Sequence, residues 1–389
     1  MSLHILITGA RAPVAVELVR ALAAAGHTVF AADSLPGPTL AGSSRACAGY
    51  LQLPPPRQRF AAFAQALHHA VARLGITLII PTCEEVFYLA QVSLPPPIQI
   101  FCPALPSLAR WHHKGQFQAL AAARGLLTPP TILVEHPAAL RAALRALPSY
   151  LLKPAYSRFA TRLITNRGPQ AGLRPLTACQ PSSARPWLAQ SFVTGTTLCS
   201  YSLVHRGHVT AHCAYVTPTT AGAGAGTAFV SVDGQASLAV VQALVDPSIS
   251  GQVALDFMLT PQGRLVLLEC NPRATSGVHL LEPAALVGGL LDPHQPTWIA
   301  PAGQRRQLSA VTLPTLALQL LQRPWHSDRW HNLATGLATP DVLFRPDDPG
   351  PSLAQVAQVA HFARLAAQQR IGLLAATTYD IEWNGHADY

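Results

Sequence analysis

Apolar and polar positions follow a strand, loop, helix and strand rhythm along the first part of the chain. The apolar run Leu3–Ile7 predicts a strand, and the apolar periodicity over 14–25 predicts a helix that Gly26 ends. A second strand is expected over 28–33, and a further helix over Phe60–Leu74. Strands that alternate with helices predict an α/β domain built on a parallel sheet.

The pattern changes after a helix expected over 113–125. Residues 149–164 predict two strands around a polar loop, and residues 186–216 predict three strands with short turns. The glycine-rich stretch 219–230 is expected to be a mobile loop. From about residue 301 the periodicity weakens, and the remaining residues are expected to form a mixed appendage.

A strand ending in three polar residues carries the clearest chemical signal. Glu269, Asn271 and Arg273 stand two positions apart after the apolar run "LVLL", so alternation places them on one face. Asp256 lies on the preceding predicted strand, "GQVALDFML", and the turn "TPQG" joins the two strands into a hairpin that can set Asp256 opposite Glu269. Two carboxylates and an amide oxygen are hard ligands that suit Mg²⁺. Without a cation the two carboxylates would repel each other.

Composition narrows the class of partner. The chain has 389 residues, of which 49% are hydrophobic and 12% charged, with a formal net charge of +9. It contains no Lys/Arg run, so we expect no nucleic-acid partner, whereas an anionic small substrate suits the charge. No apolar run reaches the ~20 residues that span a bilayer, and the N-terminus lacks signal-peptide features, so we expect a cytoplasmic protein without a membrane partner. None of the seven cysteines is in a CxxC pair.

The first strand and loop also suit a dinucleotide. Gly9 lies in the loop and Asp33 ends the second strand, where a ribose-binding acid would sit. The loop lacks the other glycines of G-x-G-x-x-G, so a domain without dinucleotide is favoured over an NAD(P)-dependent oxidoreductase. Glu84 and Glu85 follow a later strand, at an edge where such sheets bind ligands. We interpret them as acids of a helix N-terminus.

Four segments in this order resemble the ATP-grasp superfamily. The segments are "WHHKGQF", "LLKPAYS", "LAQSFVTGTTLCSYSLV" and "ALDFML…LVLLECNPRATSG". The resemblance covers roughly residues 1 to 290 and implies a Rossmann-like N-terminal domain followed by a two-lobed, α+β ATP-grasp fold. The expected division is a Rossmann-like domain over 1–110, a central lobe over 111–195, a C-terminal lobe over 196–300 and an extension over 301–389.

The resemblance also implies roles for individual residues. Lys114 and Lys153 would hold the nucleotide, Lys153 near the α-phosphate, and Arg273 would stabilise charge on the transferred phosphoryl group. Asp256, Glu269 and Asn271 would bind Mg²⁺, with Mn²⁺ as an alternative. Further nucleotide contacts are expected from the loop and hinge residues Ser157, Arg158, Arg162, Gln190, Phe192 and Val193. Gln190 stands where many relatives carry a glutamate. Ribose binding by a carboxylate, as in those relatives, is therefore not expected from this position.

The reaction that the resemblance implies is ATP-driven activation of a carboxylate as an acyl phosphate, followed by attack of an amine to form an amide and ADP. The partners would be a small carboxylic acid and an amine, with a homodimer as one option for the assembly. A non-catalytic nucleotide-binding protein is the alternative that the hinge departures leave open. His279 is equally consistent with a substrate contact and with a packed helix residue. For the tail around Asp380, a C-terminal strand or an oligomer contact is favoured over a cap on the site.

Overall fold

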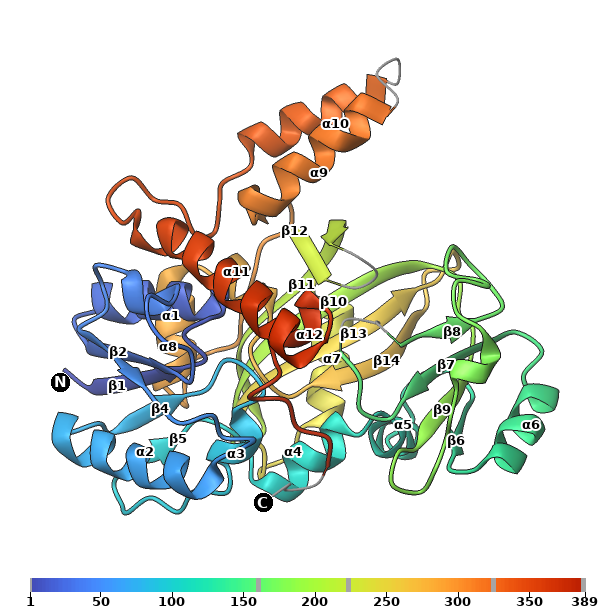
Figure 1. Cartoon of the computed structure of the whole chain (residues 1–389), viewed down its shortest axis with the longest axis horizontal. Coiled ribbons are helices and arrows are strands. Elements are labelled where there is room, and N and C mark those ends of the chain that lie inside the picture. The colour runs from blue at the N-terminus through green and yellow to red at the C-terminus, as the bar shows by residue number, and fades with distance from the viewer. Residues whose placement is uncertain (1, 159–161, 222–224, 323–326, 386–389) are drawn as a thin grey trace.

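The computed structural model describes residues 2–158, 162–221, 225–322 and 327–385. Three sheets follow one another along the chain, and a pair of helices projects from the body they form (Figure 1). The first sheet is parallel, and the second and third are mainly antiparallel. The α/β and α+β fold class predicted from the sequence is confirmed. Within the described residues, no helix has the length and apolarity needed to cross a membrane.

The first sheet has five strands in the order β3-β2-β1-β4-β5. Its strands are β1 (His4–Thr8), β2 (Thr28–Asp33), β3 (Gly49–Gln52), β4 (Leu78–Ile80) and β5 (Gln99–Ile100). Ile5 and Ile7 face the core under α1 (Pro13–Ala24), whereas Leu6 between them faces the core under α2 (Phe60–Leu74). Both faces of β1 are therefore buried, as its unbroken apolar run requires. The chain then enters α3 (Val86–Leu89) and α4 (Leu105–His112).

The second sheet is small and has its own core. Its strands, in the order β6-β9-β7-β8, are β6 (Thr131–Val134), β7 (Tyr150–Pro154), β8 (Ile164–Thr165) and β9 (Trp187–Ser191). The helix α6 (Pro137–Ala146) covers one face, where Leu140 packs with Leu152 and Trp187. Leu151 and Lys153 alternate with Leu152 and point to the opposite face of β7.

The third sheet has seven strands. They are β10 (Thr196–His205), β11 (His208–Ala221), β12 (Ala225–Val232), β13 (Gly251–Leu259), β14 (Leu265–Asn271), β15 (Trp298–Ile299) and β16 (Arg305–Gln307). Leu203 packs under α8 (Pro283–Leu291), and the adjacent Val204 packs under α7 (Gln235–Leu244), so the sheet is covered on both faces. The helix α5 (Lys114–Ala123) joins the core on the α7 side, while the core on the α8 side is continuous with the one under α1.

The glycine-rich stretch differs from its prediction. Residues 219–221 and 225–230 belong to β11 and β12, which pair antiparallel with Thr219 opposite Ala228. The β-branched threonines and the buried Phe229 favour a strand here in spite of the glycines. A Cβ atom on Gly226 would lie 2.6 Å from the Thr217 side chain, so close strand packing requires a glycine there. Residues 222–224 lie outside the described residues, and for them the predicted mobile loop stays a prediction.

Residues after 300 are not merely an appendage. β16 extends the third sheet, α9 (Ser309–Gln322) and α10 (Ser327–Ala338) project from the body, and α11 (Gly350–Gln369) and α12 (Leu373–Ala376) return to the first sheet (Figure 1). The chain then runs beside the carboxyl edge of that sheet as turns, with no strand among residues 377–385. The C-terminal strand favoured from the sequence is therefore wrong.

A buried ion cluster fixes this last segment to the N-terminal loop. Arg11 is 5% exposed, and its Nε donates to Asp33 at 3.0 Å while its Nη1 donates to Asp380 at 2.6 Å. Although burial alone would raise the pKa of Asp380, Arg11 holds it below the usual range. Asp33, which stands where a ribose-binding acid would lie, is thus committed to a structural ion cluster.

We expect Arg11→Met to lower the free energy of unfolding by about 3–5 kcal/mol, because two buried carboxylates would lose their cation. Urea denaturation followed by circular dichroism measures the change. Arg264→Met is the matched control, since Arg264 is exposed and should change stability by less than about 0.5 kcal/mol. Equal stability of the two variants would show that the cluster contributes nothing.

Candidate functional site

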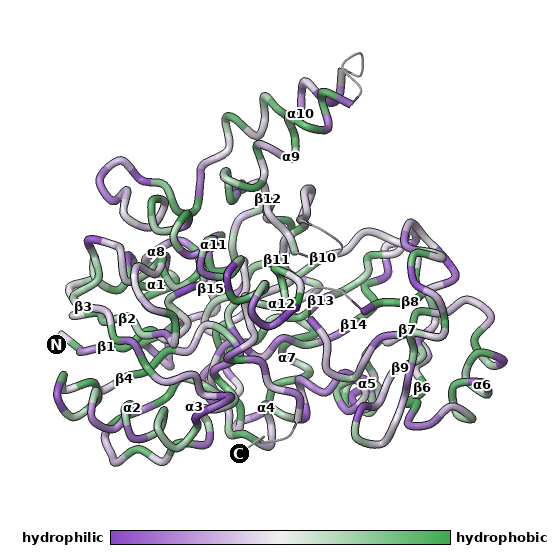
Figure 2. Tube along the Cα trace, in the orientation of Figure 1, coloured by the Kyte–Doolittle hydropathy of each residue, from purple (hydrophilic) through white to green (hydrophobic). Residues whose placement is uncertain are grey.

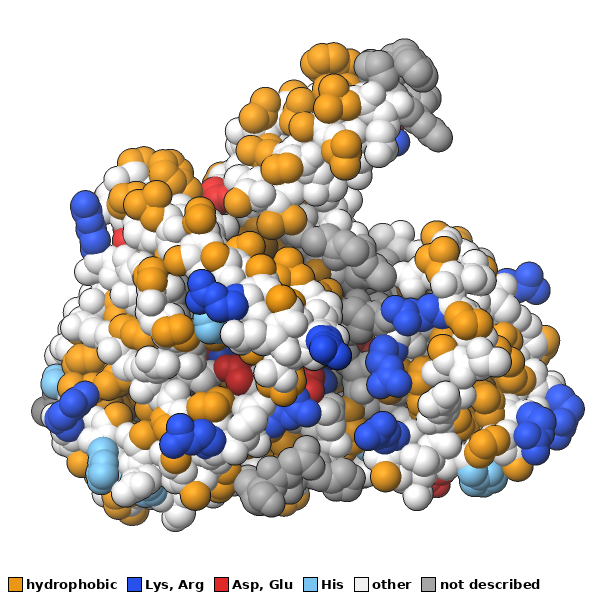
Figure 3. All heavy atoms as spheres, viewed as in Figure 1, with side chains coloured by type: hydrophobic (Ala, Val, Ile, Leu, Met, Phe, Trp, Pro, Cys, Tyr) orange, Lys and Arg blue, Asp and Glu red, His pale blue; other side chains and the backbone are white. Residues whose placement is uncertain are grey.

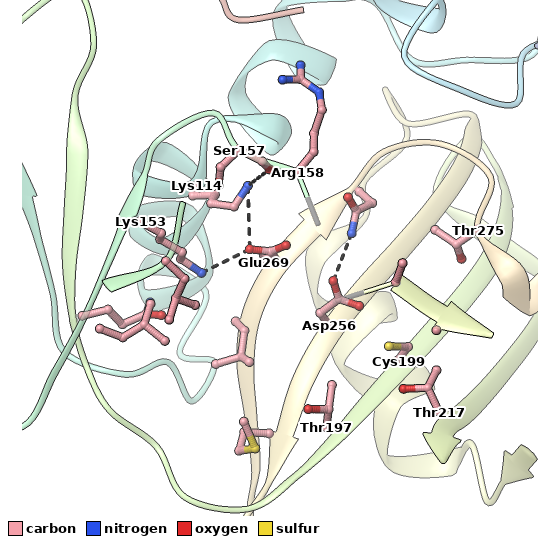
Figure 4. Close-up of a pocket in the computed structure, with 18 of the residues that line it drawn as sticks. Lys114, Lys153, Ser157, Arg158, Thr197, Cys199, Thr217, Asp256, Glu269 and Thr275 are labelled. Carbon is pink, nitrogen blue, oxygen red and sulfur yellow. Dashed lines mark hydrogen bonds and ion pairs between the residues drawn. The ribbon is translucent and has the colours of Figure 1, made fainter. Parts of the chain in front are cut away.

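A cavity of about 540 Å³ lies between the second sheet and the β13–β14 hairpin. Lys153 lines it from the second sheet, and Asp256 and Glu269 line it from the hairpin (Figure 4). Gln190 of the second sheet also lines it. All twelve site residues predicted from the sequence line this one cavity. They are Lys114, Lys153, Ser157, Arg158, Arg162, Gln190, Phe192, Val193, Asp256, Glu269, Asn271 and Arg273.

The hairpin brings the two carboxylates together. Asp256 pairs with Glu269 across the β13–β14 ladder, as the turn length predicted. A bulge follows, because Phe257 pairs with Leu267 and leaves Leu268 as an additional residue. The amide Nε2 of Gln118, on α5, donates to the carbonyl oxygens of Leu267 and Leu268 at 3.1 and 2.8 Å. A buried side chain of a neighbouring helix therefore supports the backbone that presents Glu269.

Two lysines from different elements meet Glu269. Lys153 Nζ lies 3.1 Å from Glu269 Oε2, and Lys114 Nζ, at the start of α5, lies 3.7 Å from the same oxygen (Figure 4). Lys114 Nζ also donates to the carbonyl oxygen of Ser157 at 2.9 Å. Burial opposes ionisation of Glu269, but Lys114 and Lys153 outweigh burial and lower the pKa of its carboxyl. Burial lowers the pKa of Lys114.

The pKa of Asp256 is shifted in the direction opposite to that of Glu269. Burial and the neighbouring charge of Glu269 raise the pKa of its carboxyl. Asn271 Nδ2 donates to Asp256 Oδ2 at 3.1 Å, and Arg273 Nη2 donates to Asn271 Oδ1 at 3.3 Å. The three polar positions of the strand end thus form one chain of contacts with Asp256. A carboxylate with a raised pKa beside another carboxylate is a site that a cation would stabilise.

The opposite end of the cavity is apolar. Leu151, Leu163 and Met258 line it together with the hinge residues Phe192 and Val193. Gln190 is buried, and its Nε2 donates to Thr131 Oγ1 at 2.9 Å, which leaves its amide oxygen for a ligand. The backbone N–H of Phe192 donates to the carbonyl oxygen of Ser149 at 3.0 Å. Of the backbone groups of Phe192, only the carbonyl is therefore left to bind a ligand. A flat apolar ring with one or two polar edges suits this end.

Arg158 has a role that the sequence did not predict. Its side chain points away from Glu269 (Figure 4). It binds Glu84, with Nε 2.6 Å from Oε1. Its Nη2 also donates to the carbonyl oxygen of Trp383 at 2.7 Å, and its Nη1 to Asn384 Oδ1 at 3.0 Å. Burial raises the pKa of Glu84, but Arg158 outweighs this and lowers it to about 2. Glu84 lies just before α3, as the sequence predicted, and it is also one half of a buried ion pair that the sequence did not predict.

Glu85 stands at the N-terminus of α3, as the sequence predicted, but its side chain makes no hydrogen bond to that helix. Its Oε1 accepts hydrogen bonds from Thr8 Oγ1 at 2.7 Å and from the backbone N–H of Thr82 at 3.0 Å. Burial raises the pKa of the Glu85 carboxyl, which ties β1 to the end of β4.

The C-terminal segment forms part of the wall beside Arg158. The Trp383 ring stacks on Phe87 with centroids 4.7 Å apart, and its backbone N–H donates to Glu84 Oε2 at 3.1 Å. Tyr88 Oη donates to the carbonyl oxygen of Glu382 at 2.8 Å. The tail therefore packs against a residue that lines the cavity, the arrangement that the sequence interpretation ranked below a strand or an oligomer contact.

The structure also places His279 and Arg162, two further residues that the sequence suggested for the site. His279 is 3% exposed, stacks with Phe229 and has Nδ1 3.4 Å from Glu17 Oε2, so it is a packed residue and does not line the cavity. Arg162 does line the cavity, and its guanidinium lies over the Trp187 ring at 5.5 Å. The first of the two interpretations of His279 is thus wrong, and Arg162 stays a candidate phosphate contact.

Comparison with known proteins identifies the architecture. No family model matches the chain, and no curated protein matches its sequence. The solved structure of N5-carboxyaminoimidazole synthetase from Staphylococcus aureus, complexed with ADP, matches 83% of this chain and 87% of its own, with a TM-score of 0.63 and 11% identity. L-amino acid ligase from Bacillus licheniformis matches 78% of each chain, with a TM-score of 0.53 and 13% identity.

A third match is the biotin carboxylase domain of 2-oxoglutarate carboxylase from Hydrogenobacter thermophilus, in complex with MgADP, ADP and bicarbonate. It covers 77% of this chain and 72% of its own, with a TM-score of 0.59 and 12% identity. All three proteins are ATP-grasp enzymes. The chain has the ATP-grasp fold. At these identities the likeness is one of architecture, and the roles of individual residues stay predictions.

The donor set fits the divalent cation expected at an ATP-grasp site. Asp256, Glu269 and Asn271 supply two carboxylates and one amide oxygen within one cavity. No group of three or more His, Cys, Asp or Glu side chains suited to a metal occurs in the described part of the chain, so a fully protein-made cage is absent there. An incomplete oxygen set is what Mg²⁺ uses when phosphates and water supply the other positions.

We expect Mn²⁺, measured by electron paramagnetic resonance in the presence of ADP, to bind more tightly as the pH rises through the acidic range. The raised pKa of Asp256 keeps a proton on this ligand at low pH, and that proton must leave for the metal to bind. Asp256→Asn should weaken binding by more than about tenfold and flatten the pH profile. Asp246→Asn, at a carboxylate outside the cavity whose side chain is 43% exposed, is the control. A profile that stays steep in Asp256→Asn would contradict the assignment.

We expect Arg158→Met to cost about 3–5 kcal/mol, because Glu84 would be buried without its cation. The double variant Glu84→Gln/Arg158→Met should cost less, since no charge is left buried. With a pKa of about 2 in the folded protein against an ordinary 4.5, Glu84 contributes stability that is present above pH 4.5 and lost as the pH falls toward 2. Thermal unfolding from pH 3 to 7 measures this loss, which should disappear in Arg158→Met.

Proposed function

We propose that the protein is an ATP- and Mg²⁺-dependent ligase that activates a small carboxylic acid and joins it to an amine. The carrying observation is that Asp256 and Glu269 face each other across one hairpin while Lys114 and Lys153 reach Glu269 within the same cavity. Carboxylates for a metal opposite cations for phosphates form a site for phosphoryl transfer. The ATP-grasp fold supports the proposal, because its matches include enzymes solved with ADP or MgADP.

The lysines would bind the charged end of the nucleotide. Lys114 and Lys153 are buried cations whose present partner is Glu269, and phosphate oxygens can replace that partner once Glu269 turns to a metal. The apolar end of the cavity, with Leu151 and Met258, would hold the base. Mg²⁺ held by Asp256, Glu269 and Asn271 would neutralise phosphate charge. This arrangement works by positioning and charge, and it needs no protein nucleophile.

Arg273 would bind the substrate carboxylate. Its guanidinium lines the cavity beside Asn271, and its two hydrogen bonds there are long, at 3.3 Å each. In the proposed reaction the carboxylate oxygen attacks the γ-phosphorus of ATP, which releases ADP and forms an acyl phosphate. The amine nitrogen then attacks the acyl carbon, phosphate leaves, and the amine loses a proton as the amide forms. Arg273 would stabilise negative charge in both steps.

The competing functions fit the site less well. An NAD(P)-dependent oxidoreductase would need Asp33 for the ribose, and Asp33 is bound to Arg11. A non-catalytic nucleotide-binding protein would have no use for the set formed by Asp256, Glu269, Asn271 and Arg273. L-amino acid ligase from Bacillus licheniformis, with a similar fold, supports the choice of an amino acid as the acid to test first.

We expect the purified protein with Mg²⁺ and ATP to release ADP only when a suitable carboxylic acid is present. Pools of amino acids and other acids, each with and without an amine, are screened by coupled ADP detection and by mass analysis of products. Glu269→Ala should abolish the acid-dependent release, and Arg273→Ala should lower kcat about 100–1000-fold. Glu135→Ala, at an exposed carboxylate, is the control.

Two outcomes would contradict the proposal. ADP binding without ADP release for every acid pool would favour the non-catalytic alternative. Acid-dependent release that is unchanged in Glu269→Ala would place the reaction elsewhere.

A further inference from the structure

The helices α9 and α10 form an arm that projects from the third sheet (Figure 1). The sequence of α9, "SAVTLPTLALQLLQ", contains no charged residue. Hydrophobic segments recur along both helices (Figure 2), and hydrophobic side chains cover much of the arm's visible surface (Figure 3). An arm that stood alone in water would normally carry charged residues on its outer face.

The outer apolar residues of the arm have helical spacing. Val311, Leu318 and Leu321 are separated by seven and three positions, so they lie along one stripe of α9, and they are 39%, 57% and 77% exposed. Leu316 and Leu320 are buried on another side of the helix, where Leu316 lies against Gly336 of α10. Packing within the hairpin therefore uses one face of α9 and leaves a second apolar stripe outside.

A second exposed stripe runs along α11. Leu353, Val356 and Val359 are 72%, 76% and 56% exposed, whereas Ala354 and Phe362 on the other side are buried against the first sheet and α12. Within this helix of 20 residues Arg364 is the one residue of the Asp, Glu, Lys and Arg types. The C-terminal helices thus carry two apolar stripes on elements that the nucleotide cavity does not use.

We propose that the α9–α10 arm and α11 form the interface through which two copies of this chain associate. By helix dimensions, the arm offers a face of about 20 by 20 Å and α11 one of about 30 by 10 Å. Together they amount to about 700 Å², which is close to the ~800 Å² that each partner contributes to a standard stable interface. The available surface is therefore sufficient for a dimer.

The chemistry of the surface favours a copy of the same chain over a different protein. A two-fold axis places this surface against its own copy, so apolar stripes meet apolar stripes and need no complementary charge pattern on a partner. The helix α9 contains no charged residue that could select a different partner. An apolar contact without charges is typical of a permanent homodimer interface. The inference is independent of the proposed ligase reaction, because no residue of the cavity takes part.

The test is the mass of the full-length protein in solution, by light scattering after size exclusion and by sedimentation velocity from 1 to 100 μM. We expect twice the mass of one chain for the wild type. Leu318→Glu/Leu321→Glu should shift the dimer dissociation constant at least 100-fold toward monomer, and Val356→Glu at least tenfold. Leu173→Glu, at a leucine 74% exposed outside these helices, is the matched control and should remain dimeric.

Circular dichroism and thermal unfolding establish that each variant is folded, which is expected because the changed side chains point outward. A monomeric wild type over the whole range would overturn the proposal, and so would a dimer that survives Leu318→Glu/Leu321→Glu. A third outcome would assign the stripe to a lipid surface instead. In that case the wild type stays monomeric and floats with phosphatidylcholine and phosphatidylglycerol vesicles, and Leu318→Glu/Leu321→Glu no longer floats with them.

Discussion

The contact of Lys114 and Lys153 with Glu269 is the interaction on which the site depends. It joins three elements at one point: the start of α5, the C-terminal part of β7 and the end of β14. Both lysines are buried, so their charges would be costly without a partner, and Glu269, whose side chain is 25% exposed, supplies the opposite charge. In the proposed function, the same two lysines would bind phosphates and the same glutamate would bind a divalent cation. The atoms that balance charge within the protein are therefore the atoms that would bind the ligand.

The second organising feature is the return of the chain end to its beginning. Asp380 completes an ion cluster with Arg11 and Asp33, and three residues later Trp383 stacks on Phe87 and accepts a hydrogen bond from Arg158. The fold therefore fills the carboxyl edge of the first sheet with its own tail. An edge that binds ligands in other α/β proteins has a structural use here, and the ligand cavity lies between the second and third sheets instead.

Local patterns predicted most of the site, and contacts distant in sequence were missed. The turn length between β13 and β14 was enough to place Asp256 opposite Glu269, because hairpin register follows from nearby residues. The bulge at Leu268 was not predictable, since it depends on Gln118 of a different element. The partners of Arg158 lie as far as 226 positions away, and no periodicity reports such a pairing. The extension of β11 and β12 arises from strand pairing that outweighs glycine propensity.

The shared core of α1 and α8 has a mechanical consequence. Because one apolar core runs from under the first sheet to under the third, these two parts cannot turn against each other without exposing it. The second sheet has a separate core around Leu152 and Trp187 and can rotate as a unit. Any widening of the cavity has to come from that small lobe. The ion pair between Lys153 and Glu269 joins the second sheet to the third across the cavity. It would have to break for the second sheet to move away from the third.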